Sequence, residues 1–167
     1  RSAAKDADVI FHLAAAVHNS ASTSDEYNRM NVNGTQNVIQ VAQETNAKVI
    51  HVSTVNVHGY LQGDLLDDYA RTKSQAEDLV SLAVDDGLDA VILRSATVFG
   101  NQLDRSGMIV DRILNGSLKV LPAPSRKISP VWSRDLAMAL MRAAEVGRKG
   151  HTYTVAGPTI ETAHFVE

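Results

Sequence analysis

The sequence predicts an α/β fold built on a doubly wound, mostly parallel sheet. Four short apolar segments of strand length alternate with longer segments of helical periodicity, the pattern of strands joined by crossover helices. The first of these segments is a nearly continuous apolar run, which is typical of a strand buried on both faces. With 167 residues, of which 44% are hydrophobic, the chain is long enough for one domain with a sizeable core.

The first predicted strand is the run VIFHL at 9–13, and three alanines follow it at 14–16. Side chains this small allow a helix or a ligand to pack closely. A helix is predicted over 27–45. Its inner face carries Tyr27, Met30, Gly34, Val38, Val41 and Ala42. The amide of Asn31 lies on the same side, where it needs partners in a neighbouring loop or in a cofactor.

The second predicted strand, 49–52, is followed by the hydroxyl side chains of Ser53 and Thr54. The carboxyl ends of parallel strands are where open α/β sheets bind ligands, although serine and threonine also cap ordinary turns. The loop at 59–68 contains two glycines and three aspartates and is expected to be exposed.

The helix predicted over 67–84 carries a lysine on its apolar side. Its inner face holds Tyr69, Thr72, Lys73, Ala76, Leu79, Val80, Ala83 and Val84, and Arg71, Ser74, Gln75 and Asp78 lie opposite. Burying an unpaired charge is costly, so a solvated helix would carry its lysine on the other side. Tyr69 precedes Lys73 by one helical turn, which lets their polar groups converge. Because a nearby cation lowers the pKa of a phenol, we interpret this pair as a candidate for proton transfer.

The remaining elements complete the alternation. A third strand is predicted at 89–94, then a short helix at 108–114 and a proline-bearing loop at 122–130. A helix is predicted over Ser133–Val146 and a last strand at 151–155. The inner face of that helix is expected to carry Leu136, Ala137, Leu140, Met141 and Ala144.

Composition excludes several classes of function. A net charge of −3 and a pI near 6.1 provide no basic field for nucleic acid. The chain has no cysteine for disulfide or thiolate chemistry, and its six histidines show no metal-ligand spacing, so no metal is expected. No apolar run approaches the length of a membrane helix, and no signal peptide leads the sequence. We expect a cytoplasmic protein that acts on a small molecule.

Seven segments carry a resemblance to a known family. ADVIFHLAA, NVNGT, HVST followed by HG, YARTK, LRSATVFG, SPVWSRDLA and YTVAGP occur in this order and together resemble the extended short-chain dehydrogenase/reductase family. That family contains NAD(P)-dependent epimerases, dehydratases and 3β-hydroxysteroid-type dehydrogenases. The resemblance covers nearly the whole chain and implies a Rossmann-like domain that binds NAD or NADP.

The resemblance implies catalytic roles for three residues. Tyr69 would be the general acid and base, and Lys73 would lower its pKa and bind the nicotinamide ribose. Thr54 would hydrogen-bond the substrate oxygen. The implied cofactor contacts are Leu13, Ala14, Ala15, Asn31, Ser53, Tyr69, Lys73 and Ser95. The implied reaction is hydride transfer at a secondary alcohol or ketone, and the alternatives are a nucleotide-sugar epimerase or dehydratase and a non-catalytic NAD(P)-binding regulator.

One departure from the family concerns the cofactor phosphates. The family opens with a G-x-x-G-x-x-G loop, and the ten glycines of this chain do not have that spacing. The chain is therefore expected to lack the N-terminal βαβ units, roughly 60 or more residues at about 30 per unit. By itself it is expected to bind NAD(P) weakly or not at all. Residues 101–131 and 151–167 are expected to begin a small substrate-binding portion, and the full-length protein is expected to form a homodimer.

Overall fold

The computed structural model describes residues 4–17, 23–64, 67–100, 111–117 and 125–166. They belong to two compact units, one made of residues 1–94 and 140–154, the other of residues 95–139 and 155–167. None of the helices in this described part is long and apolar enough to cross a membrane.

The first unit is organised around a sheet of four strands in the order β1-β2-β3-β7. The strands are β1 (Val9–His12), β2 (Lys48–Thr54), β3 (Ala90–Ser95) and β7 (Thr152–Val155). β1 and β2 are parallel, with Val9 opposite Lys48 and His12 opposite His51. The four predicted strands and the doubly wound parallel class are therefore confirmed.

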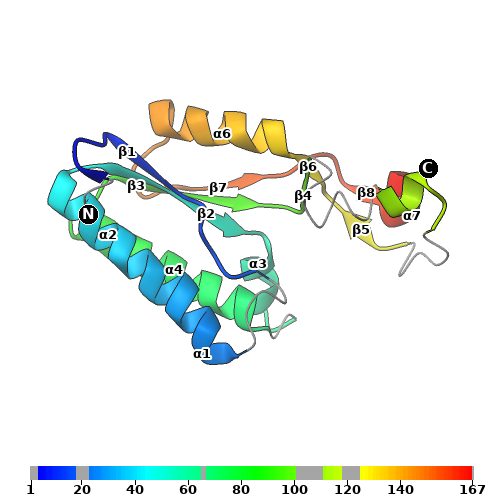
Figure 1. Cartoon of the computed structure of the whole chain (residues 1–167), viewed down its shortest axis with the longest axis horizontal. Helices are drawn as coiled ribbons and strands as arrows, with labels where there is room; N and C mark the ends of the chain where they lie inside the picture. Colours follow the sequence, from blue (N-terminus) through cyan, green and yellow to red (C-terminus); the bar gives the residue numbers. More distant parts are fainter. Residues whose placement is uncertain (1–3, 18–22, 65–66, 101–110, 118–124, 167) are drawn as a thin grey trace. The chain divides into compact units, whose positions relative to one another are not determined.

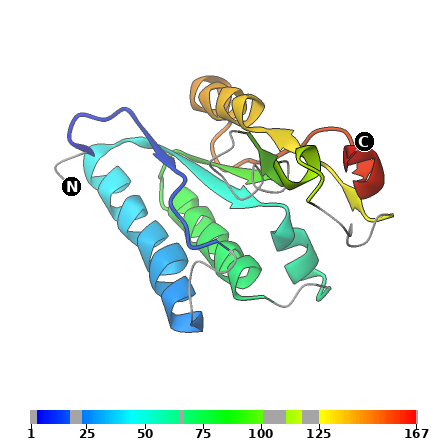
Figure 2. The same ribbon diagram turned by 45° about the vertical axis from the view of Figure 1, so that its right-hand side comes forward.

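Helices cover both faces of this sheet (Figures 1 and 2). On one face lie α4 (Asp68–Asp85) and a continuous helical stretch made of α1 (Ser24–Tyr27), the π-helical segment η2 (Asn28–Asn33) and α2 (Gly34–Thr45). The other face carries residues 140–146 of α6 (Ser133–Val146). Between the sheet and the α2 and α4 helices lies the core cluster of Ile39, Ala42, Val49, Val80, Ala83, Leu88, Ala90 and Ile92.

The π-helical segment changes which residues of its helix face inward. A π turn holds more residues than an α turn, so side chains beyond it are rotated relative to a regular 3.6-residue repeat. Met30 was predicted to face inward and is instead 46% exposed, so that prediction was wrong. Asn31 and Thr35 are buried, as are Ile39 and Ala42 further along.

Two further predictions about this unit need correction. The loop expected at 59–68 begins later, because α3 (Asn56–Leu61) occupies its first residues. Ser74 was placed on the outer face of α4 and is buried. Glu77 is buried beside it, where its carboxylate receives the Arg94 guanidinium of β3 at 2.6 Å, so α4 buries a wider face than its apolar residues indicated.

The second unit contains short pairings. β4 (Val98–Phe99) runs parallel to β6 (Val131–Trp132), and β5 (Lys127–Ile128) runs antiparallel to β8 (Ile160–Glu161). The ring of Phe99 packs on Phe165 of α7 (Thr162–Val166) at 4.5 Å between centroids. The expected loop at 122–130 therefore contains a strand within its described part. Of the helix predicted at 108–114, residues 111–114 are helical and 108–110 lie outside the described residues.

The inner face of α6 is narrower than predicted. Leu136, Leu140 and Ala143 are buried, at a spacing of four and three residues, whereas Ala137 and Met141 are exposed.

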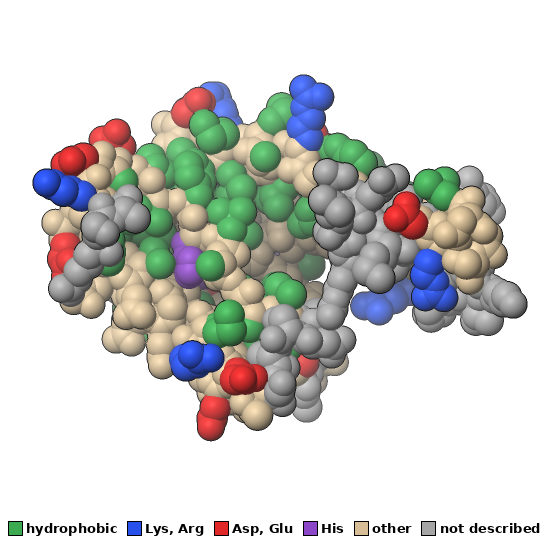
Figure 3. All heavy atoms as spheres, viewed as in Figure 1, with side chains coloured by type: hydrophobic (Ala, Val, Ile, Leu, Met, Phe, Trp, Pro, Cys, Tyr) green, Lys and Arg blue, Asp and Glu red, His purple; other side chains and the backbone are tan. Residues whose placement is uncertain are grey.

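Exposed hydrophobic side chains also follow β1, which is an edge strand of the sheet. Figure 3 shows hydrophobic side chains gathered over this side of the sheet.

Candidate functional site

The candidate site is formed where β2 ends and α4 begins. Thr54 is the last residue of β2 and is buried. Asp67 caps α4 by accepting a hydrogen bond from the amide of Ala70 at 2.6 Å, which places Tyr69 in the first turn of the helix. The side chain of Thr54 lies close to that of Tyr69 and acts to lower the pKa of its phenol. The structure therefore brings two of the three predicted catalytic residues together.

Lys73, the third predicted catalytic residue, is 2% exposed on the inner face of α4. Its ammonium donates to the carbonyl oxygen of Val52 at 2.7 Å and lies 3.4 Å from Nε2 of His51. Burial lowers the pKa of Lys73 to about 8, an effect that the carboxylate of Glu77 opposes. Lys73 is thus held against β2, the strand that ends with Thr54.

The expected lowering of the Tyr69 pKa is not found. Burial raises the pKa of Tyr69, the side chain of Thr54 acts against that rise, and the nearby Asp67 and Tyr27 add to it. The ammonium of Lys73 is directed to the Val52 carbonyl, which explains why it does not dominate the phenol's environment. Tyr69 therefore holds its proton at neutral pH in this structure.

Asn31 joins three segments of the chain. It is 1% exposed; its Oδ1 accepts from the amide of Ala16 at 2.7 Å, and its Nδ2 donates to the Ala16 carbonyl and to Oγ1 of Thr72, both at 3.0 Å. Of the two kinds of partner expected for this amide, the structure shows the neighbouring loop. Asn31 thus fixes the segment after β1 to α4.

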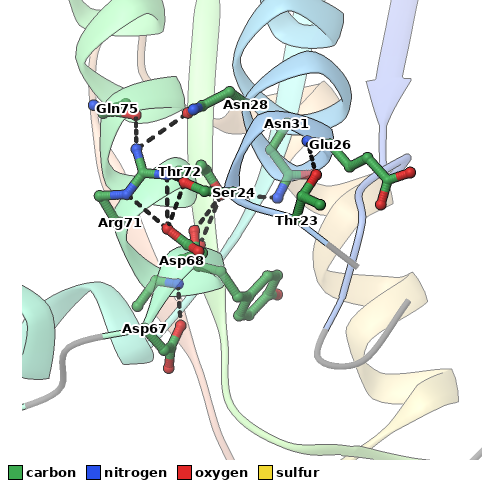
Figure 4. A network of polar contacts seen from close by, with 12 residues as sticks. Thr23, Ser24, Glu26, Asn28, Asn31, Asp67, Asp68, Arg71, Thr72 and Gln75 are labelled. Atoms are coloured by element: carbon green, nitrogen blue, oxygen red, sulfur yellow. Dashed lines mark hydrogen bonds and ion pairs between the residues drawn. The ribbon is translucent and has the colours of Figure 1, made fainter. Parts of the chain in front are cut away.

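A second polar network lies at the amino end of α4, toward solvent. Figure 4 shows Arg71 reaching Asp68, Asn28, Gln75 and Ser24, which ties the start of α4 to α1 and η2. The Arg71–Asp68 ion pair measures 2.8 Å, and with the Ser24 hydroxyl it lowers the pKa of Asp68. These contacts orient the helix that carries Tyr69 and Lys73.

The other predicted cofactor contacts are distributed along the chain. Leu13, at 54% exposure, and Ala14 are exposed, and Ala15 is half-buried, directly after the carboxyl end of β1. Ser53 is buried at the end of β2. Ser95 ends β3 and belongs to the second unit, so the structure does not join it to the residues above.

Sequence reasoning missed two buried histidines. His51 of β2 is 0% exposed and His12 of β1 is 7% exposed. The centroids of their rings are 5.3 Å apart. Burial lowers the pKa of His12 to about 4 and holds the pKa of His51 well below its usual range, and the Lys73 charge acts in the same direction on both. The signal was present in the runs VIFH and VIHV, where an imidazole interrupts an otherwise apolar strand.

Comparison with known proteins relates this chain to NAD-dependent epimerases and to a ketoreductase. The sequence model of the NAD dependent epimerase/dehydratase family matches residues 2–156. A 4-hydroxy-2-methyl-3-oxo-4-farnesyl-3,4-dihydroquinoline-1-oxide ketoreductase from Stigmatella aurantiaca is 28% identical over 95% of this chain and 52% of that protein. A UDP-glucose 4-epimerase from Vibrio cholerae is 29% identical over 75% of this chain and 42% of that protein.

A solved structure shows the same fold. The UDP-N-acetylglucosamine 4-epimerase from Methanobrevibacter ruminantium M1 superposes with a TM-score of 0.82 at 22% identity, covering 99% of this chain and 60% of that one. The chain thus spans about half the length of the curated relatives it matches. Because the family model accounts for almost all of its residues, this chain belongs to the NAD dependent epimerase/dehydratase family.

Proposed function

We propose that the whole protein containing this chain is an NAD(P)-dependent oxidoreductase that acts on a secondary alcohol or ketone. The observation that carries the proposal is the proximity of the Thr54 and Tyr69 side chains at the carboxyl end of β2, with Lys73 buried one turn further along α4. Two hydroxyls that meet in this way provide a place for a carbonyl oxygen, and the carboxyl edge of a parallel sheet is where such folds bind ligands.

Each of the three residues has a distinct role in this proposal. Thr54 donates a hydrogen bond to the substrate oxygen, and Tyr69 transfers its proton to that oxygen as negative charge develops there. A raised pKa suits Tyr69 to this direction, because the phenol keeps its proton until a stronger base, the developing alkoxide, is present. Lys73 supplies the positive charge behind the phenol.

The residues present also fit the nicotinamide end of the cofactor. Two N–H groups of Lys73 are directed at Val52 and His51, which among the described residues leaves the third for a ribose hydroxyl. The small, accessible side chains of Ala14 and Ala15 leave room beside the end of β1. When bound, the nicotinamide supplies or accepts the hydride. Further proposed contacts or supports of the cofactor are Leu13, Asn31, Ser53 and Ser95. We also propose that residues 101–131 and 151–167 form part of the substrate site.

The first experiment follows oxidation of the reduced cofactor by the whole protein with steroid ketones, flavanonols and UDP-sugars. Tyr69→Phe is expected to lower turnover by about 10²- to 10⁴-fold, because it removes the transferable proton. Tyr60→Phe removes a phenol hydroxyl of α3, outside the proposed site residues, and is expected to leave turnover unchanged. Full activity in Tyr69→Phe would contradict the proposal.

A nucleotide-sugar epimerase or dehydratase is the second candidate. The similarity to a UDP-glucose 4-epimerase over 75% of this chain favours it. The two functions separate in one assay, since an epimerase interconverts UDP-sugars without net consumption of cofactor. Tight cofactor binding without either activity would instead support a non-catalytic regulator.

Two further proposals concern the assembly. We expect the whole protein to dimerise through the helical layer of α2 and α4, where Leu82 is exposed. Analytical ultracentrifugation of Leu82→Glu should then detect monomers. We also expect this chain alone to bind NAD(P) weakly, because its glycines lack the spacing of a phosphate-binding loop. Micromolar affinity by calorimetry would contradict this expectation.

A further inference from the structure

A buried pair of imidazoles lies behind Lys73 and is not used by the proposed reaction steps. His12 and His51 face each other across parallel strands β1 and β2, where they are partners in register. Both are buried, and their rings are tilted at 49° with centroids 5.3 Å apart. Buried polar groups in the interior of a sheet are costly, so each nitrogen of these rings needs an explanation.

The contact with Lys73 fixes the tautomer of His51. An ammonium can only donate hydrogen bonds, so Nε2 of His51, 3.4 Å from Nζ of Lys73, must act as an acceptor and carry no proton. The proton of the neutral ring then lies on Nδ1. This atom is buried and meets no hydrogen-bonding partner among the described residues. Within the described part of the chain, Nδ1 lacks a partner in either tautomer, so the Lys73 contact is the interaction that distinguishes the two.

His12 is held in place from the other side. The hydroxyl of Thr35 donates to the carbonyl of Asn31 at 2.6 Å, so it accepts from Nε2 of His12 at 3.0 Å. His12 therefore carries its proton on Nε2 and is tied to the helix that contains Asn31. The neutral ring of His12 packs against that of His51, and Lys73 contacts Nε2 of His51.

We propose that His51 is a positioning residue for Lys73: its unprotonated Nε2 accepts the ammonium and, with the Val52 carbonyl, holds it against the carboxyl half of β2. The inference rests on the proposed role of Lys73 in the reaction. Without this acceptor, the ammonium keeps only the Val52 carbonyl as a partner on β2.

The remaining groups around Lys73 define what a titration would report. From β2 it faces His51, and from β1 the ring of His12 lies one step further away. From α4 it is close to Glu77, whose charge is engaged by Arg94 of β3, and it follows Tyr69 by one turn. Both imidazoles stay neutral near pH 7 because burial keeps their pKa values low. Removing the Nε2 acceptor therefore removes a dipole, not a charge.

The first test is direct and independent of turnover. In the whole protein labelled with ¹⁵N-histidine, the signal lost in His51→Gln identifies His51, and its two nitrogens report the tautomer. We expect a neutral ring with the proton on Nδ1 from pH 5 to pH 8. A proton on Nε2 at pH 7, or a protonated ring above pH 6, would overturn the proposal even if the enzyme activity is as proposed.

The second test uses two substitutions of similar shape. The Gln amide oxygen can occupy the place of Nε2, whereas Phe fills the space without an acceptor. The pKa of Lys73, followed by the ¹³Cε shift of labelled lysine, should fall by about half a pH unit or more in His51→Phe and stay near the wild-type value in His51→Gln. Equal values in the two variants would overturn the inference.

The activity profile provides the functional readout. The alkaline limb of the kcat–pH profile should move to lower pH in His51→Phe and lie at its wild-type position in His51→Gln. A merely structural loss would lower kcat equally at every pH. A protein in which Lys73 titrates as expected but which has no turnover would contradict the proposed function and leave the positioning role intact.

Discussion

The two buried polar clusters that meet α4 differ in how fully they are hydrogen-bonded. Around Asn31, each hydrogen of the amide has an acceptor and its oxygen binds the Ala16 amide, so the cluster is closed. Around Lys73, a cation is buried beside two neutral imidazoles, and Nδ1 of His51 is unsatisfied among the described residues. Both clusters contact α4 at neighbouring buried residues, Thr72 and Lys73.

The difference fits a structural role for the Asn31 cluster and the catalytic role proposed for Lys73. A closed network rigidifies the fold because every desolvated group is compensated. An incompletely satisfied cluster lowers the free energy of unfolding, and chains retain such sites where chemistry requires them. The comparison therefore predicts opposite effects on stability when each cluster is dismantled.

The largest effect is expected from Asn31→Ala. It removes three hydrogen bonds and leaves both backbone groups of buried Ala16 unsatisfied, so the free energy of unfolding should fall by about 4 kcal/mol. A urea titration measures this loss. Asn37→Ala, on the exposed side of the same helix, is the matched control and should change stability by less than about 0.5 kcal/mol.

Lys73→Met should act in the opposite direction and stabilise the protein at pH 7 by about 2 kcal/mol. The pKa of Lys73 is about 8 in the folded chain and 10.5 in the reference state, so between these values the unfolded chain binds more protons. The free energy of unfolding of the wild-type protein therefore rises as the pH increases from 8 to 10.5. The stability difference between the wild-type protein and Lys73→Met should shrink over the same range. A destabilised Lys73→Met protein at pH 7 would contradict the comparison.

The imidazoles should make the fold sensitive to acid. The pKa of His12 falls from 6.5 to about 4 on folding, and that of His51 also falls, so the unfolded chain takes up more protons as the pH decreases through this range. Stability should decrease by about 1 kcal/mol per pH unit for each histidine between pH 6 and 5. His12→Gln should reduce this slope in urea titrations at the two pH values.

Arg71→Ala should have the smallest effect. Its guanidinium has several partners, yet the ion pair with Asp68 is partly exposed and screened, so we expect a loss below about 1 kcal/mol. The same measurement on Arg142→Ala, which breaks the exposed pair with Glu145, calibrates the scale. A loss as large as that of Asn31→Ala would mean that the exposed network also holds α4 in place.

The sequence allowed the fold class and the Tyr69–Lys73 helix to be predicted, because helical periodicity is a local property. The burial of Ser74 and Glu77 was not predicted, because it depends on tertiary structure. The partner of Glu77 is Arg94, on a strand that only the folded chain brings near. The environment of Tyr69 also depended on tertiary structure, since the carbonyl of Val52 redirects the lysine that was expected to act on the phenol.

The π-helical segment has a consequence for how this chain can change in length. Because a π turn contains an additional residue, deleting one residue within Asn28–Asn33 could restore a regular α-helix without shifting the phase of α2 against the sheet. The part before the deletion would keep its orientation, because the π turn already absorbs the additional residue. Ser24 would then keep its contact with Arg71, and Tyr27 its hydrogen bond to the carbonyl of Val17. The segment is thus a point at which evolution can insert or remove a residue while both ends of the helix keep their contacts.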